Sequence, residues 1–178
     1  MIFLTLVFLV LSTTANSPFL PQTEVNQEKL KQQAQELSDA VLNSNFARAA
    51  DLTFPKLVRL LGGRAQYMAT LEKGMKEVQS DRFRISSIVV GEPRDILKVN
   101  RNYYAIVPNT MRMQVSEGEL VGEGFMIGIS TDGGQNWTFV DSGSRSMDKT
   151  SLATLFGPKA AAKLRIPEVK RPVLYRKN

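Results

Sequence analysis

The segment 130–137 contains the residues whose types and spacing suggest chemistry most directly. It reads Ser-Thr-Asp-Gly-Gly-Gln-Asn-Trp and follows the pattern S-x-D-x-G-x-x-W at every fixed position. An aspartate here can accept hydrogen bonds from turn amides, a glycine tolerates a positive φ, and the tryptophan can cover the base of a hairpin. Turn chemistry accounts for all four fixed residues. We therefore interpret Ser130, Asp132, Gly134 and Trp137 as a structural turn and do not assign Asp132 a catalytic role.

The absence of two residue types excludes several kinds of active site. The 178 residues include no cysteine and no histidine. This composition excludes disulfides, metal sites built on thiolate or imidazole, cysteine nucleophiles and a Ser-His-Asp triad.

Glu117, Glu119 and Glu123 could share one strand face and hold a hard cation, but the glycines beside them favour a bulged hairpin. We predict neither a metal ion nor a cofactor.

Helical periodicity dominates the first half of the chain. Apolar residues recur at helical spacing and turn residues separate the runs, which predicts four helices over residues 25–42, 46–52, 53–61 and 64–79. Asn45 is placed to cap the second helix, Pro55 lies in the first turn of the third, and Gly62-Gly63 ends it.

The second half changes to short runs that alternate apolar and polar residues. Turn residues such as Pro108-Asn109 and Glu117-Gly118 separate the runs, which predicts six strands over residues 83–90, 95–99, 102–107, 111–115, 120–130 and 137–141. A closing helix is expected over residues 146–156, ended by Gly157-Pro158. Helices followed by an antiparallel meander predict an α+β fold in which the N-terminal helices pack on one face of a curved sheet.

This element order resembles the cone-shaped fold of the nuclear transport factor two-like superfamily, which includes ketosteroid isomerase and SnoaL-like proteins. The resemblance covers about residues 25–142 and includes the arrangement of Phe54-Pro55-Lys56 and Gly62-Gly63 around a helix. It implies a pocket between the sheet and the helices, and a homodimer formed through the exposed sheet face. Separately, the 130–137 motif resembles the Asp-box of sialidases, in which the box is a folding element remote from the catalytic centre.

The implied pocket would have an aromatic and methionine-rich lining suited to an apolar ligand with one or two polar anchors. Its candidate residues are Tyr67, Tyr103, Tyr104, Met111, Met113, Phe125 and Trp137. The alternative is that these residues fill the core. Tyr103 and Tyr104 are adjacent, so only one of them can point inward from a strand.

Catalysis in this superfamily often uses an Asp or Glu base with a Tyr or Asp donor, so Asp51 and Glu123 are weak catalytic candidates, with ion pairing as the alternative.

Basic residues are concentrated at the C-terminal end. The net charge is +6, and residues 158–178 hold seven basic residues against Glu168 alone, so the rest of the chain is neutral overall. A neutral body lacks the basic face of a nucleic-acid-binding protein, and we predict no nucleic-acid partner. The segment from Lys159 to Lys177 is expected to be a solvated end, with weak contact to an anionic surface as the alternative.

Residues 1–11 have no charged side chain and are followed by small residues, with Thr13 and Ala15 at the −3 and −1 positions. A helix of that length extends about 16 Å, which is too short to span a bilayer. We predict a secretory signal cleaved near Ala15 and hence an exported protein, periplasmic or secreted. A retained anchor or a buried first strand is the competing interpretation.

Together these features divide the chain into a signal peptide (1–15), a flexible segment (16–24), a single α+β domain (25–157) and a basic C-terminal tail (158–178). We predict an exported, non-catalytic module that binds a small apolar molecule or a protein partner. One alternative is a cofactor-independent isomerase or hydratase that uses a buried carboxylate and a tyrosine. Another is an envelope-associated protein that docks through its basic tail.

Overall fold

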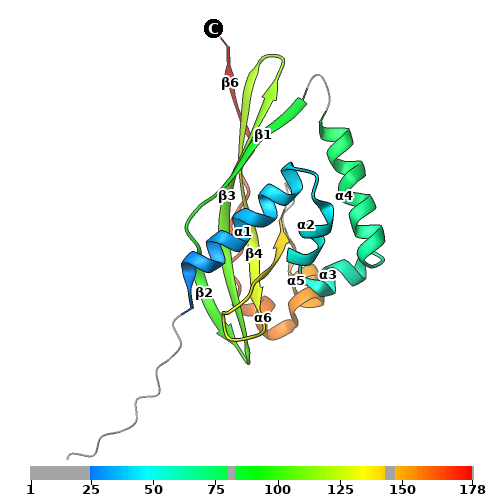
Figure 1. Ribbon diagram of the computed structural model, residues 1–178. Coiled ribbons are helices and arrows are strands. Elements are labelled where there is room, and N and C mark those ends of the chain that lie inside the picture. Colours follow the sequence, from blue (N-terminus) through cyan, green and yellow to red (C-terminus); the bar gives the residue numbers. More distant parts are fainter. Residues whose placement is uncertain (1–24, 80–82, 143–146, 178) are drawn as a thin grey trace, which may run out of the picture.

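The computed structural model describes residues 25–79, 83–142 and 147–177. The predicted signal peptide and the segment 16–24 lie outside the described residues. Four helices precede the sheet: α1 (Gln27–Leu42), α2 (Phe46–Leu52), α3 (Pro55–Leu60) and α4 (Arg64–Val78). Five strands follow: β1 (Phe83–Val90), β2 (Arg94–Val99), β3 (Asn102–Val115), β4 (Gly118–Ser130) and β5 (Thr138–Asp141). The chain ends with α5 (Lys149–Phe156), α6 (Pro158–Lys163) and β6 (Val173–Arg176) (Figure 1).

Local signals in the sequence account for the helix boundaries. The Asn26 side chain accepts a hydrogen bond from the Lys29 N–H at 3.0 Å, and Asn45 caps α2 in the same way through the Arg48 N–H at 3.2 Å. Both caps supply an acceptor for amides that have no partner inside the helix. Gly62 and Gly63 have φ values of 93° and 87°, which breaks the helical path between α3 and α4.

The six strands form one antiparallel sheet around the β3–β4 pair. The strand order is β1-β3-β4-β5. In addition, β2 pairs with β3 on the same edge as β1, and β6 pairs with the beginning of β4. The sheet is curled, and α1 and α2 pack against one of its faces (Figure 1). This is the α+β architecture expected from the sequence, and its shape is consistent with a cone-like fold.

The predicted turn at Pro108-Asn109 is wrong, because β3 runs without interruption from Asn102 to Val115. The backbone hydrogen bonds explain how a proline fits there. The Pro108 carbonyl accepts from the Gly91 N–H at 2.8 Å, at the point where pairing with β1 gives way to pairing with β2. The N–H and C=O of one residue in a strand point the same way, so the missing donor of Pro108 faces this junction and the pairing with β4 is intact.

Alternation along the strands divides the apolar residues between two cores. One core packs α1 and α2 on the sheet and contains Leu30, Ala34, Leu37, Ala105, Val107, Met126, Trp137 and Phe139. The other lies on the opposite face under α5 and α6 and contains Tyr104, Ile106, Phe125, Ile127, Ile129, Leu152, Leu155, Ala160 and Leu164. The central strands are therefore covered on both faces. The predicted homodimer, which would use an exposed sheet face, stays a prediction.

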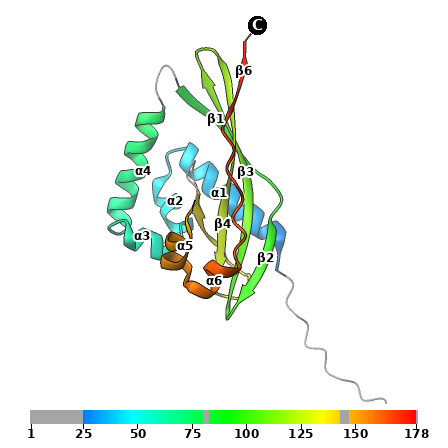
Figure 2. The same cartoon turned by 180° about the vertical axis from the view of Figure 1, so that it is seen from behind.

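The basic side chains of the C-terminal residues are exposed, as expected, but their backbone forms regular structure that we did not predict. Gly157 ends α5, as predicted, and Pro158 then begins a second short helix, α6, in which Ala160 is 1% exposed. The chain then returns over the sheet and β6 pairs with β4, from Val121↔Val173 to Gly118↔Arg176 (Figure 2). Sequence periodicity could not show this, because strand pairing between distant segments leaves no local pattern.

None of the helices that the structure describes is long and apolar enough to cross a membrane.

Substitution of two glycines on β4 tests how closely α1 approaches the sheet. A Cβ on Gly128 would lie 3.0 Å from Leu30 Cδ1 and 3.2 Å from the Trp137 ring, so we expect Gly128→Ala to lower the free energy of unfolding by about 1–3 kcal/mol. A Cβ on Gly122 would meet Pro172 at an ordinary 3.5 Å, so Gly122→Ala should change it by less than about 0.5 kcal/mol. Urea unfolding of both variants measures the difference, and equal stability would contradict the packing described.

Candidate functional site

A cavity of about 460 Å³ lies between helices α1 and α4 and the sheet. Its apolar wall consists of Leu37 and Val41 from α1, Leu71 from α4, and Ile88, Met111, Met126 and Phe139 from the strands. Polar groups at the wall come from Ser38, Thr53, Tyr67 and Asp141. The rest of the lining comes from Asn109, residues 122–124 and residues 169–172 of the returning C-terminal chain. Its exposed members, Glu123 and residues 170–172, mark the rim.

The cavity exists because α4 does not close onto the sheet. Every residue of α4 keeps some solvent exposure, including Tyr67 and Leu71 on the side that faces the cavity. In contrast, Leu37 and Met126 on the opposing walls are buried. An amphipathic helix normally buries its apolar stripe against a core, so the half-buried stripe of α4 leaves room for another apolar body.

Three hydroxyl groups belong to lining residues that are buried or half-buried, Ser38, Thr53 and Tyr67, and we call this part of the lining the inner end. All three are already committed as donors. Ser38 Oγ donates to the Ala34 carbonyl at 3.3 Å, and Thr53 Oγ1 donates to the Ala49 carbonyl at 2.8 Å. Thr53 Oγ1 also lies 3.0 Å from the Tyr67 hydroxyl. A threonine hydroxyl has one proton and a carbonyl can only accept, so Tyr67 is the donor in this last hydrogen bond.

The Tyr67 hydroxyl remains protonated at neutral pH. Burial raises the pKa of Tyr67, the hydrogen bond with Thr53 lowers it, and the negative charge of Asp141 raises it, with a net increase. The proton is therefore present and is directed at Thr53. A tyrosine in this state presents oxygen lone pairs, and not a free proton, to a bound molecule.

Only two of the seven residues predicted for the pocket line the cavity, and most of the others lie in the two cores. Tyr67 and Met111 line the cavity, whereas Met113 is not among its lining residues. Tyr104 and Phe125 belong to the core under α5 and α6, where Tyr104 packs edge-on to Phe156 with ring centroids 5.7 Å apart. Trp137 is 1% exposed in the core under α1.

The adjacent tyrosines lie on opposite faces, as strand alternation requires. Tyr103 packs at the margin of the core under α1, and the Lys98 ammonium lies 5.1 Å from its ring centroid. Sequence reasoning missed Leu37, Val41, Leu71 and Ile88 as lining residues, because they look like ordinary core positions. Their periodicity shows that they face the sheet, but only the position of α4 decides whether they meet a neighbour or a cavity.

The two candidate carboxylates are ion-paired. Asp51 pairs with Arg64 at the surface and does not line the cavity. Glu123 lies at the rim, with its Oε2 3.7 Å from Lys170 Nζ, and both side chains are exposed. Glu119 pairs with Arg112 at 2.6 Å. Within residues 25–79, 83–142 and 147–177, no three acidic side chains gather as a metal site would require.

The Asp132 carboxylate organises the turn between β4 and β5. Its Oδ1 accepts from the Gln135 and Asn136 N–H groups at 3.1 and 2.9 Å and from the Ser130 hydroxyl at 2.8 Å. The Asn136 side-chain amide donates to Oδ2 at 2.8 Å. The Ser130 hydroxyl oxygen accepts from the Gly134 N–H at 2.9 Å. Trp137 Nε1 donates to the Gly134 carbonyl at 3.2 Å, so the turn holds the indole ring in the core.

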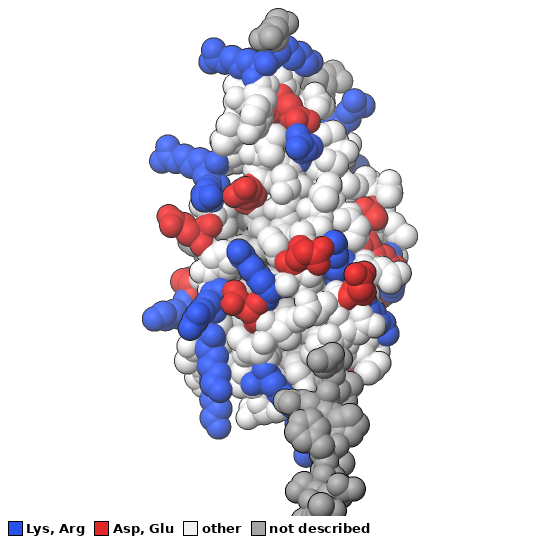
Figure 3. Space-filling model, turned by 90° about the vertical axis from the view of Figure 1, so that its left-hand side faces the viewer, with Lys and Arg blue, Asp and Glu red and all other residues white. Residues whose placement is uncertain are grey.

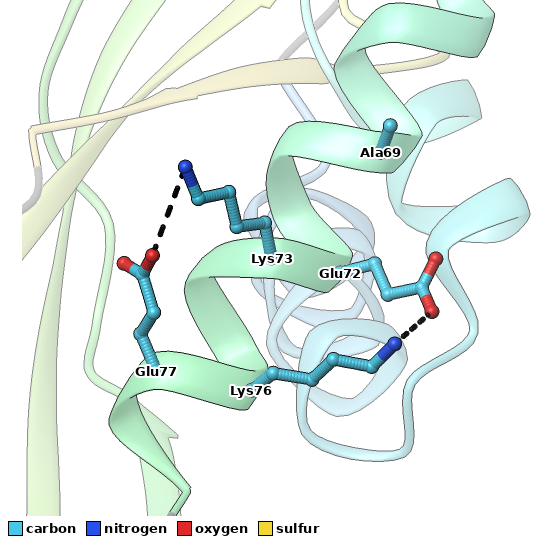
Figure 4. A pocket seen from close by; sticks show the side chains of 5 residues that line it. All are labelled: Ala69, Glu72, Lys73, Lys76 and Glu77. Carbon is cyan, nitrogen blue, oxygen red and sulfur yellow. Dashed lines mark hydrogen bonds and ion pairs between the residues drawn. The ribbon is translucent and has the colours of Figure 1, made fainter.

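A second, open hollow lies on the outer surface of α4 and is lined by Ala69, Glu72, Lys73, Lys76 and Glu77 (Figure 4). Its charged groups pair along the helix, with Lys76 2.7 Å from Glu72 and Lys73 3.9 Å from Glu77. Exposed pairs of this kind contribute about 0.3–0.5 kcal/mol each. These charged side chains therefore pair with one another along the exposed side of α4.

The surface charge is mixed in sign. Acidic and basic side chains are interspersed over the middle of the face shown in Figure 3. This distribution agrees with the zero net charge of residues 1–157. The absence of a nucleic-acid partner stays a prediction.

Comparison with known proteins gives no relative. No family model matches the chain, and neither the curated proteins nor the solved structures contain a match.

The turn between β4 and β5 predicts an acid-dependent loss of stability. Partial burial raises the pKa of Asp132, but hydrogen bonds from Asn136, Ser130 and Gln135 outweigh it and lower that pKa from its ordinary 3.8 to about 2. A lowered folded-state pKa stabilises the protein fully above the ordinary value, and this contribution is lost as the pH falls from about 4 to about 2. Because the side chain is exposed, we expect Asp132→Ala to cost only about 1–2 kcal/mol at neutral pH.

Urea unfolding between pH 2 and 7 measures this contribution. The stability difference between wild type and Asp132→Ala should shrink as the pH falls through this range, while the exposed neighbour Thr131→Ala serves as the control. A difference that is independent of pH would show that the carboxylate charge does not stabilise the turn.

Proposed function

We propose that this protein is a non-catalytic binding module that holds a small apolar ligand in the cavity between α1, α4 and the sheet. The observation that carries the proposal is an apolar-walled space of about 460 Å³ beside a helix whose apolar side is only half-buried. Burial of apolar surface yields roughly 25 cal/mol per Å², so covering Leu71, Ile88 and Met111 would contribute favourably to the binding of an apolar ligand.

The fold supports a proposed membership of the nuclear transport factor two-like superfamily. N-terminal helices packed on a curled antiparallel sheet are compatible with that fold, and the cavity lies between those helices and the sheet. Fold alone does not imply function, so the proposed ligand binding rests on the cavity and not on this membership.

We also propose that the protein is exported after cleavage near Ala15. Support comes from the uncharged apolar residues 1–11 and the small residues that follow. The intact mass of protein purified from the exported fraction tests this proposal. A mass corresponding to a new N-terminus at Asn16 would support it, and an intact Met1 would refute it.

The isomerase or hydratase alternative has less support from the site. Such chemistry needs a carboxylate base near the substrate and a donor for the developing oxyanion. Asp51 lies outside the cavity lining, Glu123 is paired at the rim, and the proton of Tyr67 is already donated to Thr53. The enzyme alternative therefore stays a prediction with less support than ligand binding.

Docking on an anionic surface stays the second candidate function. Its support is that all seven basic residues after position 157 are exposed. Truncation after Gly157 cannot test it, since that change also removes the buried Ala160 and Leu164. Charge reversal at Lys159, Lys163 and Arg165 is the better variant, with salt-sensitive binding to anionic vesicles as the readout.

Blocking the cavity tests the main proposal. N-phenyl-1-naphthylamine, a small apolar fluorescent probe, should bind wild type saturably, and Leu71→Trp should weaken its binding at least tenfold because the indole fills the space. Ala69→Trp adds the same side chain on the outer surface of α4 and should leave binding unchanged. Fluorescence titration gives the Kd of each protein. Absence of saturable binding to folded wild type would refute the proposed function.

A further inference from the structure

The polar groups at the inner end of the cavity restrict the chemistry of the ligand. Ser38, Thr53 and Tyr67 all line the cavity, and each hydroxyl proton is engaged within the protein: by the Ala34 carbonyl, the Ala49 carbonyl and Thr53 Oγ1, respectively. The oxygens of these groups retain lone pairs. Among the residues that the structure describes, these three hydroxyl groups therefore offer a ligand acceptors, and their protons are already used within the protein.

We infer that the ligand carries an apolar body and a hydrogen-bond-donating head group, an alcohol or an amine, that binds against Tyr67 at the inner end. This inference rests on the proposed function, since it specifies the ligand of the same cavity. A carbonyl, ether or carboxylate placed against these three hydroxyls would meet their lone pairs, and unpaired acceptors that are removed from water weaken binding.

The rim has the opposite character, and this sets the direction of the ligand. Lys170 and Arg171 contribute exposed cations, and Asn109 contributes an amide, near Glu123 at the mouth of the cavity. A ligand with a carboxylate would place its head group at the mouth and its tail inside. A ligand with a hydroxyl would bury its head group and leave its tail toward the mouth.

Two probes with the same number of heavy atoms distinguish these cases. Octan-1-ol can donate a hydrogen bond, whereas 1-methoxyheptane can only accept one. Isothermal titration calorimetry on the mature protein should give a Kd for octan-1-ol about 5- to 10-fold below that for 1-methoxyheptane. Equal affinities would overturn the inference and leave the proposed function intact, whereas no binding of either probe would refute the proposed function itself.

Variants of the hydroxyl pair test the direction of the proton. Thr53→Val removes the acceptor of the Tyr67 proton. The proton then becomes available to the ligand, so the preference for octan-1-ol over 1-methoxyheptane should fall to twofold or less. Thr53→Ser keeps the hydroxyl and should keep the preference. Tyr67→Phe removes the oxygen and should abolish the preference for octan-1-ol while both probes still bind. This variant tests the inference even if Thr53→Val does not fold. Tighter binding of octanoate than of octan-1-ol, lost in Lys170→Gln, would place the head group at the rim and overturn the inference.

Discussion

The uninterrupted pairing of β3 with β4 is the constraint on which the other elements depend. It extends from Tyr103↔Ser130 at one end to Val115↔Gly118 at the hairpin turn. The outer edge of β3 holds β1 and β2, and the outer edge of β4 holds β5 and β6. Since side chains alternate across a strand, this single register assigns each apolar residue of the two long strands to one face or the other. A shift of one residue would exchange the two cores.

The two cores differ in how completely they are closed, and the cavity follows from that difference. The face under α5 and α6 is filled by residues from helices that lie directly against it. On the other face, α1 and α2 cover the end of the sheet near Trp137, but α4 stands at the side and keeps all its residues partly exposed. Tight packing at Gly128, where Leu30 approaches closely, and open space at Met111 therefore coexist on one sheet face.

Hydroxyl protons connect this architecture to the proposed function. The helix carbonyls of Ala34 and Ala49 orient the Ser38 and Thr53 hydroxyls, and Thr53 in turn orients the Tyr67 proton. Secondary structure thus decides which hydrogen bonds a ligand can make. The same hydrogen bond engages the Tyr67 proton, which an isomerase of the kind considered as an alternative would use as a donor.

The sequence by itself determined the features that depend on neighbouring residues. The caps at Asn26 and Asn45, the break at Gly62-Gly63 and the turn around Asp132 all arise from groups within a few residues of one another. Periodicity also predicted the α+β class and most element positions, because an apolar face must be buried whatever covers it. The absence of cysteine and histidine excludes thiolate and imidazole chemistry whatever fold the chain adopts.

Tertiary structure decided the features that depend on residues far apart in the chain. Pro108 lies within a strand because its missing N–H faces the junction of β1 and β2, and the basic end becomes α6 and β6 because the edge of β4 is open to pairing there. The cavity residues Leu71, Ile88 and Met111 have the same sequence pattern as core residues. An apolar periodicity specifies which side of an element faces inward, but the distance to the opposing element is set by the packing of the whole chain.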